Sequence, residues 1–124
     1  QASLVGSEMC IRDRVNTLEK IDNKNISEIT SPTFSLMNQY KLNKFDIHHY
    51  DLYRLKSEKD ILSLNIFEDI SDKIVLIEWP EILGEHKPRN TIDINFEYGE
   101  NFNSRYLTIS AYEKLKIFDE FKSL

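Results

Sequence analysis

The sequence has a single cysteine, Cys10, among its 124 residues. One thiol excludes an internal disulfide framework and any zinc site built from several cysteines. A reducing, cytoplasmic location is therefore the expectation. No apolar run approaches the ~20 residues that a membrane helix needs, and no secretory pattern opens the chain. We therefore expect no membrane partner.

An excess of basic residues is also absent. The formal net charge is −5, and acidic and basic residues are interspersed along the chain. Phosphate neutralisation requires clustered Lys and Arg, so the composition argues against direct, general binding of nucleic acid. A hydrophobic content of 40% suits one small domain with a single core.

The first fourteen residues, QASLVGSEMCIRDR, differ from the rest of the chain. They show no apolar period and no helix N-cap, and they begin without methionine. The segment resembles a translated sequencing-adapter fragment, so we expect residues 1–14 to be a disordered, non-native head. The alternative is a flexible natural terminus.

The residues after the head predict alternating helices and strands. Helical character appears in VNTLEKI (15–21), which is followed by an extended stretch at 29–42. FDIHHYDLY (45–53) alternates as a second strand, and the turn at 43–44 makes the two an antiparallel hairpin. SEKDILSLNIFEDI (57–70) is typical of a helix that Ser57 caps and that ends near a left-handed Asn65.

The second half of the chain predicts a buried strand, a hairpin and a tail helix. Residues 74–77 are apolar on both faces, which favours a central strand covered on both sides. A loop is expected at 84–88. TIDINFEY and RYLTISAY form the second hairpin, and residues 111–124 place apolar side chains three apart, as in an amphipathic helix.

Glu78 ends the apolar strand and is the first candidate site residue. A carboxylate at the C-terminal end of a central strand lies where open α/β sheets bind ligands. In P-loop NTPases an acid at that place holds Mg²⁺, directly or through water. The alternative is an acid that begins a solvent-exposed loop.

HHYDLYR (48–54) is the second cluster. His49, Asp51 and Tyr53 share one strand face because side chains alternate. Asp51 is suited to a magnesium-bound water, which His49 would orient by a hydrogen bond. Alternatively, His49 and Tyr53 edge a core while Asp51 pairs with Arg54 or a lysine. A zinc site is weaker, because adjacent histidines on a strand point to opposite faces.

TSPTF (30–34) is the third cluster, with hydroxyls that would reach a phosphate or a metal-bound water. The segments SPTF, HYDLYR and LIEWPE occur in the order and spacing of the bacterial TsaE family. The chain resembles that family from about Ile29 to about Ser110. The family is the ATPase component of the tRNA threonylcarbamoyladenosine modification system.

The resemblance implies an α/β, P-loop NTPase-like fold with a mostly parallel sheet and antiparallel hairpins, carried by residues 15–110. It implies binding of ATP and Mg²⁺ and work with TsaB-type and TsaD-type subunits, which modify adenosine 37 of tRNA. Contact with tRNA would be indirect. By position, Glu78 resembles the Walker B acid and magnesium ligand, and Asp51 resembles the acid of the HxDxYR motif that supports ATPase function and the metal. Thr33 falls in a nucleotide-sensing segment, and Trp79 resembles the aromatic beside the nucleotide.

The chain departs from the family in its glycines. It has only Gly6, Gly84 and Gly99 and no Gly-Lys pair. A Walker A loop uses backbone N–H groups, a lysine and a hydroxyl to hold phosphates and Mg²⁺. We therefore expect the P-loop strand and Walker A to be missing and this polypeptide, as written, not to bind ATP tightly or hydrolyse it.

Two other functions remain open from the sequence. One is a non-catalytic interaction module of the same complex, although two acids aimed at phosphates would then have little physical use. The other is a hydrolase that uses Asp51 and Glu78 as acid and base, for which no sugar-binding aromatic groove is identifiable.

Overall fold

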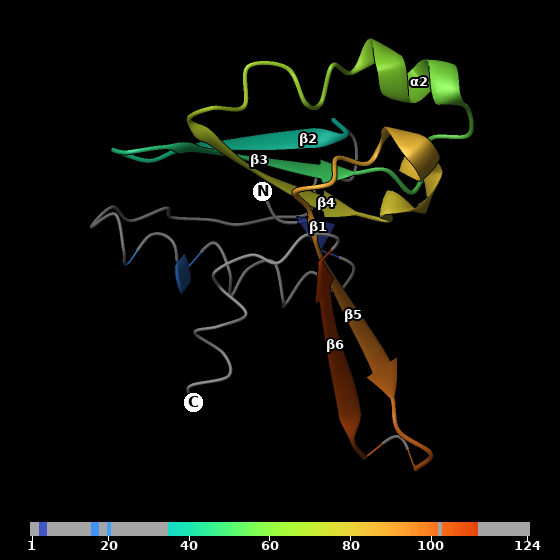
Figure 1. Ribbon diagram of the computed structural model, residues 1–124. Coiled ribbons are helices and arrows are strands. Elements are labelled where there is room, and N and C mark those ends of the chain that lie inside the picture. Colours follow the sequence, from blue (N-terminus) through green and yellow to red (C-terminus); the bar gives the residue numbers. More distant parts are fainter. Residues whose placement is uncertain (1–2, 5–15, 18–19, 21–34, 102, 112–124) are drawn as a thin grey trace.

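The computed structural model describes residues 3–4, 16–17, 20, 35–101 and 103–111. Within them lie two three-stranded sheets, in the orders β2-β3-β4 and β1-β5-β6. A short helix and a 3₁₀ segment lie beside the first sheet, and a long hairpin extends away from it (Figure 1). The chain is therefore of the mixed α/β class, as the sequence predicted.

The first sheet contains the predicted hairpin and the apolar strand. β2 (Met37–Lys41) pairs antiparallel with β3 (Asp46–Asp51), and β3 pairs parallel with β4 (Lys73–Glu78). The backbone N–H of Leu42 donates to the carbonyl of Phe45 at 3.1 Å and closes the turn between β2 and β3. The first hairpin is thus confirmed.

Both faces of this sheet are covered by apolar side chains. Ile47, fully buried, and Leu76 lie in a cluster on one face that Ile94 of the second sheet joins. Val75 and Ile77 lie in a second cluster on the opposite face. This arrangement confirms that the strand at 74–77 is buried on both faces. Its central position in the sheet is not found: within the described part of the chain, β4 is an edge strand.

The helix α2 (Glu58–Ser63) covers the second of these clusters with Ile61. Ser57 is its N-cap, as predicted, and forms a capping box with Asp60. The helix is shorter than the predicted span of 57–70, because the chain turns left-handed at Asn65, with φ of 48°. The left-handed stop predicted at this asparagine is confirmed.

The second sheet contains the second predicted hairpin. β5 (Ile92–Tyr98) pairs antiparallel with β6 (Arg105–Ala111), and the two-residue β1 (Ser3–Leu4) pairs parallel with β5. Among the described strands, parallel and antiparallel pairings are equally frequent. The expected mostly parallel sheet is therefore not observed among the described strands. The short β1 contacts both β4 and β5 where the two sheets meet.

The segment between the sheets is more ordered than the predicted loop. η1 (Pro80–His86) is a 3₁₀ segment with proline in its first turn, where a missing N–H costs nothing. Gly84 interrupts it with φ of 49°. None of the helices that the structure describes is long and apolar enough to span a bilayer.

Several predictions fall wholly or partly outside the described residues. Asn16, Thr17 and Lys20 are helical, as predicted for residues 15–21. Of the head, only Ser3–Leu4 is described, as the strand β1, so disorder of residues 1–14 as a whole stays a prediction. Thr33 and the tail at 112–124 also lie outside the described part of the chain.

Candidate functional site

Two carboxylates lie opposite each other where β3 and β4 end. Asp51 is the last residue of β3, Glu78 is the last residue of β4, and the two are register partners. Partners in a parallel pair project their side chains from the same face of the sheet, across a strand spacing of about 4.8 Å. The two acids therefore converge at one edge, as the sequence suggested, while their catalytic and metal-binding roles stay predictions.

Glu78 is buried and held by a histidine. Its side-chain Oε1 lies 2.7 Å from Nε2 of His49. Glu78 is 5% exposed and His49 is 1% exposed. A buried carboxylate needs such a partner, because an uncompensated charge in the interior is strongly destabilising. The alternative of an acid that begins a solvent-exposed loop is thereby excluded.

The contact between His49 and Glu78 is the functional feature that sequence reasoning missed. The sequence analysis placed His49 beside Asp51, as the group that orients a bound water. In the structure His49 is the register partner of Leu76, two residues before Glu78 on the same face. Strand alternation alone puts His49 and Asp51 on one face, but only the register between β3 and β4 brings His49 to Glu78.

Asp51 has a different environment. Its Oδ1 accepts a hydrogen bond of 3.0 Å from the backbone N–H of Tyr53. This side-chain turn bends the chain as it leaves β3. The backbone N–H of Leu52 also donates to the carbonyl of Glu78 at 3.1 Å, which extends the pairing of the strands by one bond. The strand ends that carry both acids are thus tied together.

Trp79 directly follows Glu78 and has a left-handed backbone, with φ of 57° and ψ of 55°. Its ring contacts that of Tyr53, with centroids 5.0 Å apart and the planes tilted by 55°. Trp79 is 50% exposed and Tyr53 is 68% exposed. The two rings therefore form an aromatic surface directly after the strand ends that carry the acids.

The opposite face of β3 carries His48, whose setting differs from that of His49. Burial lowers the pKa of His48, and the charge of Lys73 lowers it further, while Asp46 and Asp72 oppose the shift. His48 contacts the ring of Tyr50, with centroids 6.4 Å apart, and burial raises the pKa of that tyrosine. The surroundings of His48 therefore favour its neutral form, and the strand register places it on the face opposite the acid pair.

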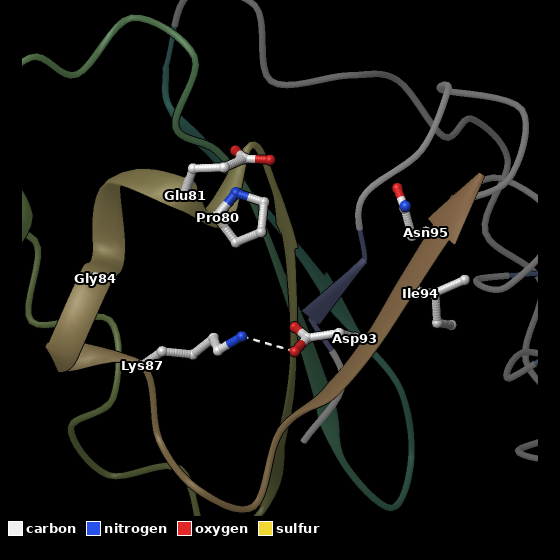
Figure 2. A pocket seen from close by; sticks show the side chains of 7 residues that line it. All are labelled: Pro80, Glu81, Gly84, Lys87, Asp93, Ile94 and Asn95. Atoms are coloured by element: carbon white, nitrogen blue, oxygen red, sulfur yellow. Dashed lines mark hydrogen bonds and ion pairs between the residues drawn. The ribbon is translucent and has the colours of Figure 1, made fainter. Parts of the chain in front are cut away.

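A pocket of about 410 Å³ lies between η1 and the start of β5. Figure 2 shows Lys87 reaching across it to Asp93, with 2.6 Å between Nζ and Oδ2. Glu81, Gly84 and Asn95 are also part of its lining. Neither Asp51 nor Glu78 lines this pocket, so it is separate from the site at the strand ends.

Comparison with known proteins identifies the chain. The model of the family described as threonylcarbamoyl adenosine biosynthesis protein TsaE matches residues 11–107, well over half of the sequence. This chain belongs to the TsaE family. The match includes Asp51, Glu78 and Trp79, and it begins four residues inside the segment expected to be foreign.

TsaE proteins of several bacteria are similar in sequence. The protein of Rickettsia conorii is 41% identical over 88 residues, which are 71% of this chain and 50% of that protein. The protein of Rickettsia prowazekii is 40% identical over 67% of this chain and 57% of its own length. The chain thus spans about half the length of these TsaE relatives.

A solved structure supports the fold. The crystal structure of Bacillus subtilis YdiB superposes with a TM-score of 0.61 over 98% of this chain and 75% of that chain. The sequence identity is 16%, so the superposition supports the TsaE chain's α/β architecture and nothing finer.

Proposed function

We propose that this chain is part of the ATPase component of the machinery that makes threonylcarbamoyladenosine at position 37 of tRNA. In this proposal the whole protein has a P-loop NTPase-like fold and binds ATP with Mg²⁺ in the cytoplasm. It supports turnover by TsaB-type and TsaD-type subunits and does not transfer the threonylcarbamoyl group itself. Membership of the TsaE family supports the pathway.

The observation that carries the proposal is the register pairing of Asp51 with Glu78. Two adjacent parallel strands deliver one acid each to the same edge of the sheet, where α/β proteins bind nucleotides. Glu78 is held by His49 and Asp51 by the N–H of Tyr53, so both carboxylates are fixed before any ligand arrives. Pre-positioned acids of this kind suit phosphoryl transfer, in which the protein mainly positions groups and stabilises charge.

The acid pair fits Mg²⁺ by its donor chemistry. Mg²⁺ prefers oxygen ligands and is usually held by one or two carboxylates, with water and substrate phosphates completing its shell. No group of three or more His, Cys, Asp or Glu suited to a metal occurs among the described residues. Asp51 and Glu78 would hold the ion, which when bound neutralises charge on the transferred phosphate.

Binding of the nucleotide phosphates requires groups that this sequence does not contain. Its three glycines lie far apart, and no lysine follows a glycine. A phosphate cradle requires consecutive backbone N–H groups and a lysine. We therefore propose that Trp79, and Thr33 in the undescribed segment, contribute to a nucleotide site whose phosphate-binding wall the chain does not contain.

A chimera tests the function. In the Rickettsia conorii relative, the stretch that this chain matches is replaced by the corresponding residues of this chain. We expect the chimera to hydrolyse ATP and this chain alone to show no micromolar ATP affinity by calorimetry. In the chimera, Glu78→Gln should lower the hydrolysis rate about 100-fold, the order that a positioned acid or base contributes.

Asp51→Asn should have a similar effect, because it removes the charge from the second carboxylate. Glu81→Gln is the matched control, since Glu81 is an exposed acid three residues after Glu78 and should leave the rate unchanged. Hydrolysis that survives both Glu78→Gln and Asp51→Asn would refute the proposed role of the pair.

A further inference from the structure

We propose that His49 is a positioning residue that fixes Glu78 as a ligand with a single available oxygen. The inference rests on the proposed function, since it concerns how the acid pair presents itself to a divalent cation. In this inference one carboxylate oxygen of Glu78 accepts the hydrogen bond from His49, and the other oxygen is available to a cation.

The contact is built into the sheet. His49 lies two residues before the end of β3, opposite Leu76, and its ring reaches forward along the same face to Glu78. The Nε2–Oε1 distance of 2.7 Å is that of a charge-assisted hydrogen bond. Both side chains are almost fully buried. A pair that is buried on two adjacent strands has little freedom to rotate.

The direction of the hydrogen bond follows from what each group can do. An ionised carboxylate only accepts, so Nε2 of His49 carries the proton and donates to Oε1 of Glu78. The other ring nitrogen, Nδ1, is buried and has no hydrogen-bond partner among the described residues. A proton there would be a buried donor without an acceptor, which costs about 1–3 kcal/mol. The geometry therefore points to Nε2 of His49 as the donor that holds Oε1 of Glu78.

In this arrangement each of the two carboxylates uses one oxygen for a hydrogen bond within the protein. His49 occupies Oε1 of Glu78, and the backbone N–H of Tyr53 occupies Oδ1 of Asp51. Each acid is left with one oxygen to which the described residues make no hydrogen bond. Two such oxygens, on register partners of adjacent strands, form a pair of monodentate ligands. Groups that orient a metal ligand typically change metal affinity 10–100-fold when they are removed.

His49 can be tested in this chain without ATP. The probe is Tb³⁺, an oxygen-seeking ion whose luminescence is excited through a nearby indole, and Trp79 directly follows Glu78. Three variants are compared with the unaltered chain. His49→Leu removes the donor and keeps similar volume, and His49→Gln keeps an N–H donor at a similar reach. His48→Leu is the matched control, the same change at the next residue on the opposite face.

We expect Trp79-sensitised Tb³⁺ binding to weaken about tenfold or more in His49→Leu. It should stay within about threefold of the unaltered chain in His49→Gln, because the donor is restored. His48→Leu should bind as the unaltered chain does. Thermal unfolding identifies any variant that has lost its fold. If His49→Leu does not fold, His49→Asn replaces it, because its shorter amide cannot reach Oε1.

A second measurement needs no variant. Nitrogen NMR of the imidazole should show a proton on Nε2 of His49, as a donor to Glu78 requires. An Nε2 without a proton would overturn the proposal, and so would unchanged Tb³⁺ affinity in a folded His49→Leu. Those results leave the proposed function intact. The proposed ion site requires that the unaltered chain bind Tb³⁺ and that Glu78→Gln and Asp51→Asn abolish this binding. If either result is not obtained, the ion site of the proposed function fails and this inference fails with it.

Discussion

At the scale of single residues, the site combines a buried, hydrogen-bonded His–Glu pair with a residue in a strained conformation. His49 and Glu78 satisfy each other inside the sheet, and Trp79 then takes a left-handed backbone that a residue with a side chain adopts only at a cost of about 1–2 kcal/mol. Such conformations persist where the surrounding structure fixes them, and they concentrate at functional sites. Here the turn places the indole against Tyr53 instead of continuing the strand.

The strain at Trp79 gives a prediction about stability. Glycine adopts φ of 57° without penalty, whereas a β-branched residue resists it. We expect Trp79→Gly to change the free energy of unfolding by less than about 1 kcal/mol, because relief of strain offsets the lost ring contact. Trp79→Val should be less stable than Trp79→Gly by at least about 1 kcal/mol in urea unfolding. Equal stability of the two variants would show that the left-handed turn carries no strain.

At the scale of elements, α2 depends on its N-terminal cap. The side chain of Ser57 accepts from the backbone N–H of Asp60 at 3.3 Å, and Oδ2 of Asp60 accepts from the backbone N–H of Ser57 at 3.2 Å. A helix of six residues makes few hydrogen bonds of its own. Its position over the sheet therefore rests on this cap and on the burial of Ile61.

Removal of the cap should be visible in stability and in its pH dependence. Ser57→Ala should lower the free energy of unfolding by about 1 kcal/mol at pH 7. The side-chain hydroxyl of Ser57, and then the backbone N–H groups of Lys56 and Ser57, hold the pKa of the Asp60 carboxyl below its ordinary value of 3.8. A lowered carboxyl pKa stabilises the fold above 3.8, and that stabilisation is lost as the pH falls through the lower, folded-state value.

The decrease in the free energy of unfolding between pH 5 and pH 2.5 should therefore be smaller in Ser57→Ala than in the unaltered chain. The substitution removes the main cause of the lowered pKa of Asp60. Urea unfolding at several pH values measures it, with Ser63→Ala as a control at the other end of α2. Equal acid sensitivity in Ser57→Ala and the unaltered chain would contradict the assignment to this cap.

The same elements show what sequence can and cannot predict. Strand alternation, the cap at Ser57 and the stop at Asn65 are local signals, and each predicted its element. The edge position of β4 and the contact between His49 and Glu78 depend on which strands pair and in what register. That information lies in contacts between residues 29 positions apart, which no local pattern encodes. The positions of Asp51 and Glu78 at the strand ends were therefore predictable, but the partner of Glu78 was not.

At the scale of the whole molecule, a short strand joins the two sheets that the structure describes. β4 has six residues and β5 has seven. The strand β1, which contacts both of them, has two residues. Within the described part of the chain, β4 pairs as a strand only with β3, although its side chains are buried. A strand edge without a hydrogen-bonded neighbour is a template for pairing with other chains. We accordingly expect this chain to aggregate as its concentration rises.

Hydrogen exchange offers a direct test of that strand edge. A strand inserted beside β4 would pair with its open edge and protect the β4 amides that face it. We expect these amides of Val75 to Ile77 to exchange at least tenfold more slowly in the chimera with the Rickettsia conorii relative than in this chain, about 1.4 kcal/mol of added protection. The amides of β3 are the internal control, because β2 and β4 flank that strand in both proteins. If β3 and β4 gain protection equally, the chimera is more stable throughout and no strand has been added at this edge. If neither gains, β4 already has a partner on its open side, and the expected aggregation loses its physical basis.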